Sequence, residues 1–181
     1  MKRALFRTLF LNIAEATLKD FQTNNIPNAI ISVILCISIP LVYAKGQKQA
    51  WVFSKEKPGD LLAYTSAGWN FLYTTWNLAF VFGESPTFFA SSFCILFAAE
   101  FYPILKKRPE LYVTARIYTL ATKLLLRATY DIFTPVMNSS SWYSESVHNY
   151  WGWVNLAIAI PFTVVWLRNV KKRRGEAIEV K

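Results

Sequence analysis

Histidine, cysteine and charged residues are all scarce in this 181-residue chain. His148 is the single histidine, and the two cysteines, Cys36 and Cys94, both lie inside apolar stretches without a CxxC pair. These are too few sulfur and imidazole ligands for a zinc or haem site, so neither a metal site nor a cofactor is predicted. A P-loop, GxSxG, HExxH and a dinucleotide-binding fingerprint are also absent, which argues against an enzyme.

Charged residues make up 17% of the chain, against about 25% in soluble proteins, while apolar residues reach 54% and aromatic residues 17%. The apolar residues come in blocks of about 17 to 24, long enough to cross a hydrocarbon core about 30 Å thick. The net charge of +9 lies mostly between these blocks and in the tail, which indicates membrane topology rather than nucleic-acid binding. The predicted fold class is therefore all-α, an integral membrane helical bundle.

The apolar blocks predict five transmembrane helices. The first opens after Pro27, a residue suited to the first turn of a helix, and segments rich in Lys or Pro separate the others. Together the helices form one domain over residues 28–168, followed by a basic tail over 169–181. The predicted spans lie near 28–44, 61–82, 87–105, 111–134 and 151–167.

Basic residues are divided unequally between the segments that join these spans. Segments 83–86 and 135–150 contain no Lys or Arg, whereas segments 45–60, 106–110 and 168–181 contain thirteen. Because Lys and Arg concentrate in cytoplasmic loops, the second group is predicted to be cytoplasmic, in a plasma (inner) membrane with the C-terminus inside. Glu84 and His148, in the first group, are expected to be solvated surface residues.

Residues 1–27 carry an amphipathic helix over 1–21, with apolar residues at intervals of three and four. We interpret it as a helix lying in the membrane interface. Its four basic residues would then lie outside, against the charge rule, so a sixth, polar span is the alternative. Arg7 interrupts the apolar run, which makes a signal peptide a poor fit.

The fourth predicted helix contains a stripe of ionisable residues. Arg116, Lys123 and Arg127 fall within about 40° of one another on a helical wheel, with Asp131 about 40° further round. Each such group at the centre of a membrane costs about 2.5–3.5 kcal/mol, so the stripe should face other helices or a water-filled cavity. The alternative is a basic amphipathic helix that lies flat on the membrane.

Polar residues on the neighbouring spans offer partners for this stripe. Asn70, Tyr73 and Asn77 share one face of the second span, either as interhelical hydrogen bonds or as ligand contacts. Glu100 and Arg116 lie at matching depths in the third and fourth spans and are predicted to form a buried ion pair. A proton- or substrate-coupled Glu100 is the alternative to a purely structural pair.

Three functions remain open at this stage. The leading one is a transporter- or channel-like protein with a cationic intramembrane cavity for an anionic or polar small solute. The others are a membrane enzyme or lipid-binding protein that holds an anionic headgroup, and a structural subunit of a membrane complex. Expected partners are the lipid bilayer, the anion or headgroup, and an oligomer or partner membrane subunit. The predicted ligand-binding residues are Lys123, Arg127, Asn70, Tyr73, Asn77 and Asp131.

Overall fold

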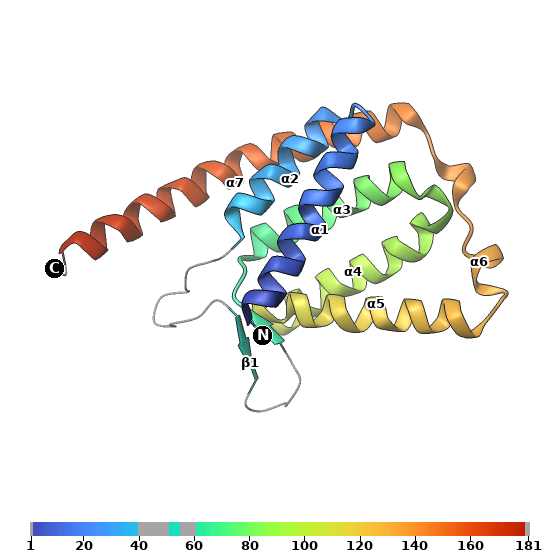
Figure 1. The fold of residues 1–181 in the computed structure, drawn as a ribbon, viewed down its shortest axis with the longest axis horizontal. Helices are drawn as coiled ribbons and strands as arrows, with labels where there is room; N and C mark the ends of the chain where they lie inside the picture. Colours follow the sequence, from blue (N-terminus) through green and yellow to red (C-terminus); the bar gives the residue numbers. More distant parts are fainter. Residues whose placement is uncertain (1, 40–50, 55–60, 180–181) are drawn as a thin grey trace.

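A computed structural model describes residues 2–39, 51–54 and 61–179. Within these residues the chain forms seven α-helices and one two-stranded antiparallel sheet (Figure 1), so the predicted all-α class is confirmed. The helices are α1 (Lys2–Gln22), α2 (Ile26–Ser38), α3 (Ala67–Glu84), α4 (Phe89–Lys106), α5 (Tyr112–Thr129), α6 (Phe133–Val136) and α7 (Glu145–Glu179). The strands are β1 (Trp51–Phe53) and β2 (Leu61–Ala63).

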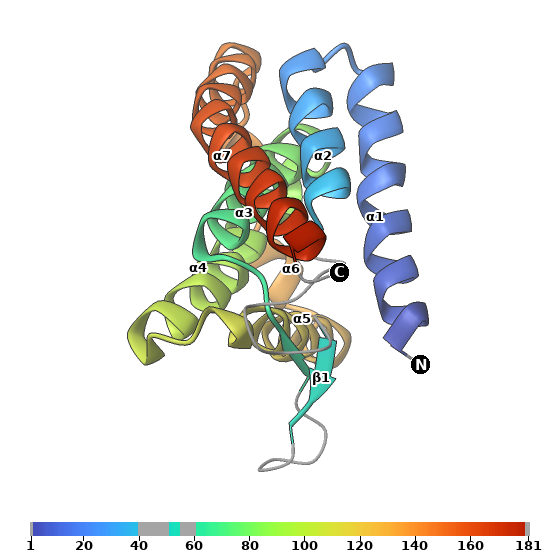
Figure 2. The same cartoon turned by 90° about the vertical axis from the view of Figure 1, so that its left-hand side faces the viewer.

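The long helices form a curved row of direct neighbours (Figure 2). α1 and α2 are an antiparallel hairpin, α2 packs against α7 and α3, α3 packs against α4, and α4 packs against α5. α1 and α5 therefore lie at the two ends of the row. The sheet supports the start of α5, where the Thr114 hydroxyl donates a hydrogen bond to the Leu61 carbonyl of β2.

The ends of the long helices gather in two groups, although the helices are inclined to one another and α7 extends beyond the others (Figure 1). The N-terminus of α1 lies at the end where α2 and α4 finish and α3 and α5 begin. The α1–α2 turn lies at the opposite end, beside the α3–α4 turn and the start of α7. α1 packs along α2 and buries Ile13, Ala16 and Thr17. Its interfacial position and the alternative of a sixth span both stay predictions.

The predicted start of the second span is wrong. The second span was expected from Leu61, but Leu61–Ala63 is β2, paired with β1 in the register Trp51 to Ala63. The helix starts later, where the Ser66 hydroxyl accepts a hydrogen bond from Trp69 N at 3.1 Å and caps α3. A three-residue apolar run carries too little periodicity to separate strand from helix.

The fourth and fifth predicted helices also differ in length. α5 ends at Thr129 rather than 134, because Tyr130 has an extended backbone. The last helix is longer than the predicted 151–167, since α7 already starts at Glu145 and passes through Pro161 without ending. The first span was predicted to reach residue 44, but α2 ends at Ser38 and residues 40–44 lie outside the described residues.

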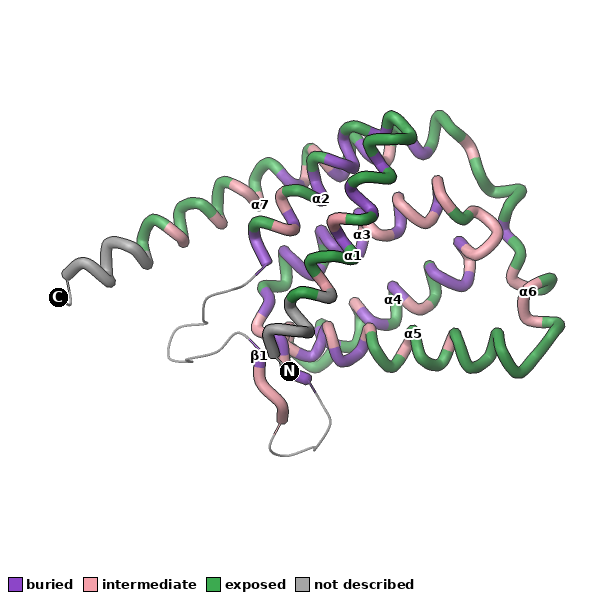
Figure 3. Tube along the Cα trace, viewed as in Figure 1, coloured by how far each residue is buried: buried purple, intermediate pink, exposed green. Residues whose placement is uncertain are grey.

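Large apolar side chains are exposed on every long helix. Figure 3 shows that exposed positions occur along each of these helices. Examples are Leu11 (65% exposed), Leu105 (77%), Leu125 (67%) and Ile160 (62%). In the part of the chain that the structure describes, two helices, Pro86–Lys106 and Glu145–Lys172, are long and apolar enough to cross a membrane. Ile26–Ser38 is apolar but shorter. The five predicted spans are thus not established by length and hydropathy.

Candidate functional site

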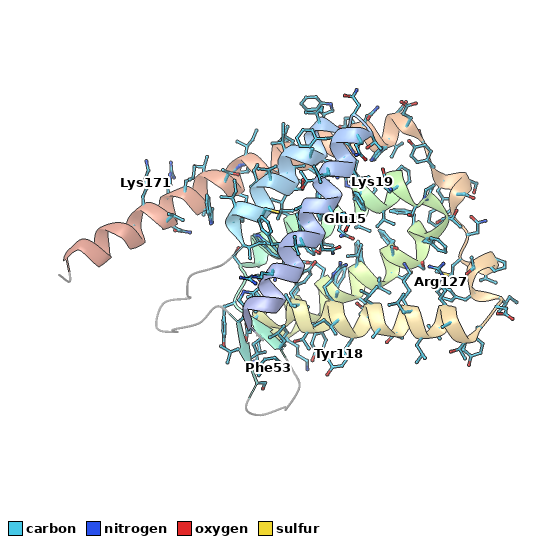
Figure 4. The ribbon with its side chains drawn as sticks, in the orientation of Figure 1. Glu15, Lys19, Phe53, Tyr118, Arg127 and Lys171 are labelled. Atoms are coloured by element: carbon cyan, nitrogen blue, oxygen red, sulfur yellow. The ribbon has the colours of Figure 1, made fainter. Side chains whose placement is uncertain are left out.

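Lys123 is half-buried and faces α4, while Arg127, one turn further along α5, is exposed. The Lys123 ammonium donates a hydrogen bond to the Ser92 hydroxyl of α4 at 2.7 Å, and Ser92 is buried. The Arg127 guanidinium stacks on the Phe88 ring, 4.2 Å from its centroid. Figure 4 shows Arg127 near the end of α5 that lies away from the N-terminus. Both cations therefore meet neutral partners across the α4–α5 boundary.

Arg116 lies about two helical turns earlier on the same stripe. Its guanidinium is 5.5 Å from the centroid of the Tyr73 ring of α3, a cation–π contact. Glu100 of α4 lies near enough for the two charges to interact, but its carboxylate accepts a hydrogen bond from Thr74 Oγ1 at 2.8 Å instead. Thr74 in turn contacts the Tyr112 hydroxyl at 2.6 Å. Glu100 and Arg116 thus belong to one polar cluster without the direct ion pair that was predicted.

No carboxylate of the described residues lies within 4.0 Å of the cations of the α5 stripe. Among the described side chains the ion pairs within 4.0 Å are Lys19–Glu84 and Arg108–Glu110, neither of which involves α5. Asp131, predicted as a ligand-binding residue, is exposed beyond the end of α5 and forms no ion pair with another described side chain. The three α5 cations are close enough for Arg116 and Arg127 to act on the Lys123 charge. Positive charge therefore accumulates along this face.

The three predicted residues of α3 are not all gathered at the cations. Asn70 donates through Nδ2 to the Pro109 carbonyl at 3.0 Å, and its own carbonyl oxygen is buried without a donor. Tyr73 stacks on Trp69 with the ring centroids 5.1 Å apart. Asn77 is half-buried. Of the three, the structure brings Tyr73 to the stripe, through Arg116.

A second polar cluster, which the sequence analysis missed, lies at the end of the bundle where α1 meets α2. Asn28 donates through Nδ2 to Asp20 Oδ2 at 2.9 Å, and the Asn25 amide nitrogen lies 2.9 Å from His148 Nε2. All four side chains are buried. The expectation that His148 is a surface residue is therefore wrong.

Glu84 also differs from its expected solvated state. Its carboxylate pairs with the Lys19 ammonium at 2.9 Å, and the Glu84 side chain is 15% exposed. This ion pair ties the last turn of α1 to the last turn of α3.

Helical periodicity was the signal that could have located this second cluster. On α1, Thr17 and Asp20 continue the buried series that starts at Ile13, at the intervals of three and four that define one face. On α2, Asn28 continues the series of Ile31 and Leu35 in the same way. Polar residues at buried positions on both arms of a predicted hairpin indicate contact across it.

His148 lies outside the predicted span 151–167, at the first turns of α7. Burial lowers the pKa of His148 below its ordinary value of 6.5, and the opposing effects of the Glu84 charge, the Ala79 carbonyl and the Glu145 charge are weaker. The ring is therefore neutral at pH 7, and Nε2 accepts the hydrogen bond from the Asn25 amide.

We expect the titration of His148 to contribute a loss of stability as the pH is lowered from 7.5 to 5.5. The unfolded chain binds a proton on His148 near its ordinary pKa of 6.5, whereas the folded protein resists it, so acid favours unfolding. Thermal denaturation of the purified protein across this range measures the effect. His148→Gln keeps a hydrogen-bonding side chain that does not titrate, so its loss of stability should be smaller. An equal loss in both proteins would contradict the assignment.

Comparisons with protein families, with curated proteins and with solved structures find no significant match to this chain. No residue role is therefore carried over from a relative.

Proposed function

We propose that the protein is a multi-pass membrane protein of the plasma (inner) membrane with six spans, one more than predicted. The many exposed large apolar side chains on α1, α2, α4, α5 and α7 support a lipid environment, since soluble monomers rarely expose large apolar patches. The packing of α1 along α2, in a helical hairpin, supports a span for α1. A membrane-spanning α1 would bring the basic N-terminal segment to the same side as the other basic segments, as the charge rule requires.

The function proposed for this bundle is binding of an anionic group along α5, in a transporter- or channel-like protein. The carrying observation is that Arg116, Lys123 and Arg127 share one face without a carboxylate within 4.0 Å among the described residues. An unneutralised cation inside a membrane is costly, and water, an anion or a lipid headgroup removes that cost. A small soluble anion and an anionic headgroup present the same chemistry to these side chains.

Lys123 occupies the centre of this proposed site. Its hydrogen bond to Ser92 uses one of the three ammonium donors, so a ligand oxygen can accept another. Arg127, one turn further along α5, offers planar donors suited to a carboxylate or phosphate. A structural subunit remains the competing function, in which acidic side chains of a partner chain neutralise the stripe.

Thermal stability of the purified protein in the presence of different anions tests the proposal. We expect phosphate, sulfate or a small carboxylate to raise the denaturation midpoint, and the double variant Lys123→Gln/Arg127→Gln to lose that rise while remaining folded. Lys106→Gln/Lys107→Gln, which removes two exposed charges at the end of α4, should keep it. Stabilisation by nanodiscs containing phosphatidylglycerol, but not by soluble anions, would identify a headgroup as the ligand.

Two results would overturn the anion site. One is equal stabilisation of the wild-type protein and the Lys123→Gln/Arg127→Gln variant. The other is the absence of any effect of soluble anions and anionic lipid on the wild-type protein. If the chain is also unstable when expressed alone, the structural-subunit function takes its place.

A further inference from the structure

Asp20 is the most deeply buried carboxyl group among the described residues, with 1% of its surface exposed. It lies on the face of α1 that packs against α2, one turn before the hairpin turn. Asn28 Nδ2 donates to its Oδ2 at 2.9 Å, and the buried indole of Trp76 borders it. Thr17 and Ser32 hydrogen-bond one turn deeper in the same interface, at 2.7 Å.

The charge of Asp20 has no cationic partner in the described part of the chain. The neighbouring Lys19 points outward, with its side chain 56% exposed, and pairs with Glu84 rather than with Asp20. Figure 4 shows Lys19 and Glu15 along α1. An ionised carboxylate that is buried beside neutral groups alone is strongly unfavourable. Glu84 lies near enough to add a second negative charge to the surroundings of Asp20.

The side-chain amide of Asn28 also carries a buried oxygen that lacks a hydrogen-bond donor. This oxygen is Oδ1, and Asn28 is fully buried. Nδ2 of the same amide bonds to Asp20, so the orphaned oxygen belongs to the amide group that contacts the carboxylate. A buried acceptor without a donor destabilises a fold by about 1–3 kcal/mol. The Asp20 carboxylate and Asn28 Oδ1 together need a positively charged group that accepts no hydrogen bond.

We propose that Asp20 and Asn28 form a buried binding site for a monovalent cation, either a proton or an alkali-metal ion. Carboxylate and amide oxygens are hard ligands that suit hard cations. A proton taken from water would convert the carboxylate to an acid whose O–H donates to an acceptor such as Asn28 Oδ1. Either ion removes the buried negative charge. Buried ionisable residues in membrane helices mark ion pathways and proton relays.

The site does not depend on the anion site proposed for α5, since Asp20 lies on α1 at the other end of the helix row. Its position near the α1–α2 turn places it toward the side without basic loops. The titratable and charged groups that face this region are Lys19 on α1, Glu84 on α3 and His148 on α7. Of these, His148 gives a pH dependence of opposite sign, so its titration can be separated from that of Asp20.

The test is thermal denaturation of the full-length protein in chloride salts of sodium, lithium, potassium and choline at constant ionic strength. His148→Gln is the background, and pH 8 and pH 6 are compared. An alkali-ion site predicts a midpoint that rises by about 3–5 °C for each tenfold increase in sodium or lithium above the dissociation constant. A proton site predicts a higher midpoint at pH 6 that is the same in every salt.

Asp20→Asn replaces the carboxylate by a neutral amide of the same shape, whose N–H can donate to Asn28 Oδ1. This variant should be folded, and its midpoint should respond neither to the cation nor to this change of pH. Glu15→Gln makes the same charge change at an exposed position of α1, and its midpoint should respond to cations and pH as it does with Glu15 in place. The Lys123→Gln/Arg127→Gln variant should also keep the response. Two results would overturn the cation site. One is a response to cations or pH that persists in the Asp20→Asn variant. The other is the absence of any such response in the protein that keeps Asp20.

Discussion

A cysteine at Ser141 will react with a membrane-impermeant maleimide on intact cells, and a cysteine at Gly175 will react only after permeabilisation. Ser141 is exposed in the segment without basic residues, while Gly175 follows the basic run at the end of α7. The experiment needs a background in which Cys36 and Cys94 are replaced by alanine. The expected difference is nearly all-or-none, because a bilayer excludes the charged reagent.

An epitope tag before Met1 extends the same experiment to α1. If α1 spans the membrane antiparallel to α2, the tag will be accessible only after permeabilisation, like the cysteine at Gly175. An interfacial α1 would leave the tag accessible on intact cells, and the count of spans would return to five. Reversed labelling of Ser141 and Gly175 would instead refute the orientation of the whole bundle.

Gly83→Ala will lower the stability of the protein by about 1–3 kcal/mol, the range found for overpacked cores. A Cβ at this position of α3 would lie 2.6 Å from His148 Nε2, and the ring is enclosed by Phe82, Tyr143 and Asn25. The ring would have to leave its place and give up the hydrogen bond with Asn25. Thermal denaturation of the purified variant measures the loss.

Gly68→Ala is the matched control for this substitution, because Gly68 lies in the same helix. Its Cβ would meet Phe162 at 3.5 Å, an ordinary contact. Removing a glycine from a helix normally stabilises it, by up to about 1 kcal/mol for an interior position, so this variant should be no less stable than the wild type. Adding His148→Ala to Gly83→Ala should reduce the difference between glycine and alanine at position 83. If Gly83→Ala alone is harmless, the close approach of the ring does not exist in solution.

The helices could be predicted from the sequence to the extent that their apolar residues form long blocks. The run after Pro86 and the run before Arg168 predict helices because each is continuous and bounded by breaking or basic residues. The strand at Leu61–Ala63 could not be predicted in this way, because its pairing with Trp51–Phe53 is a contact between segments. Strand preference of so short a run depends on the partner that it meets.

The two polar clusters also differ in whether a single segment of sequence is enough to predict them. The stripe of Arg116, Lys123 and Arg127 could be recognised from the sequence, because exposing ionisable residues of an apolar helix to lipid costs free energy. The role of Asp20 could not be seen, because an acid near the end of an amphipathic helix is normally solvated. Only the packing of α1 on α2 shows that Asn28 covers it.

In the proposed membrane orientation, the length of α7 would set the distance between the bilayer and any partner that meets the end of this helix. With 35 residues α7 is about 52 Å long, well beyond the thickness of a hydrocarbon core of about 30 Å. If its span ends near Leu167, Lys171 and Lys172 stand about 6–8 Å further out, within the reach of lipid charge at physiological salt. The helix continues for about 18 Å beyond the span, to Glu179. A cytoplasmic protein could therefore meet a stiff rod whose far end stands clear of the electrostatic field of the bilayer.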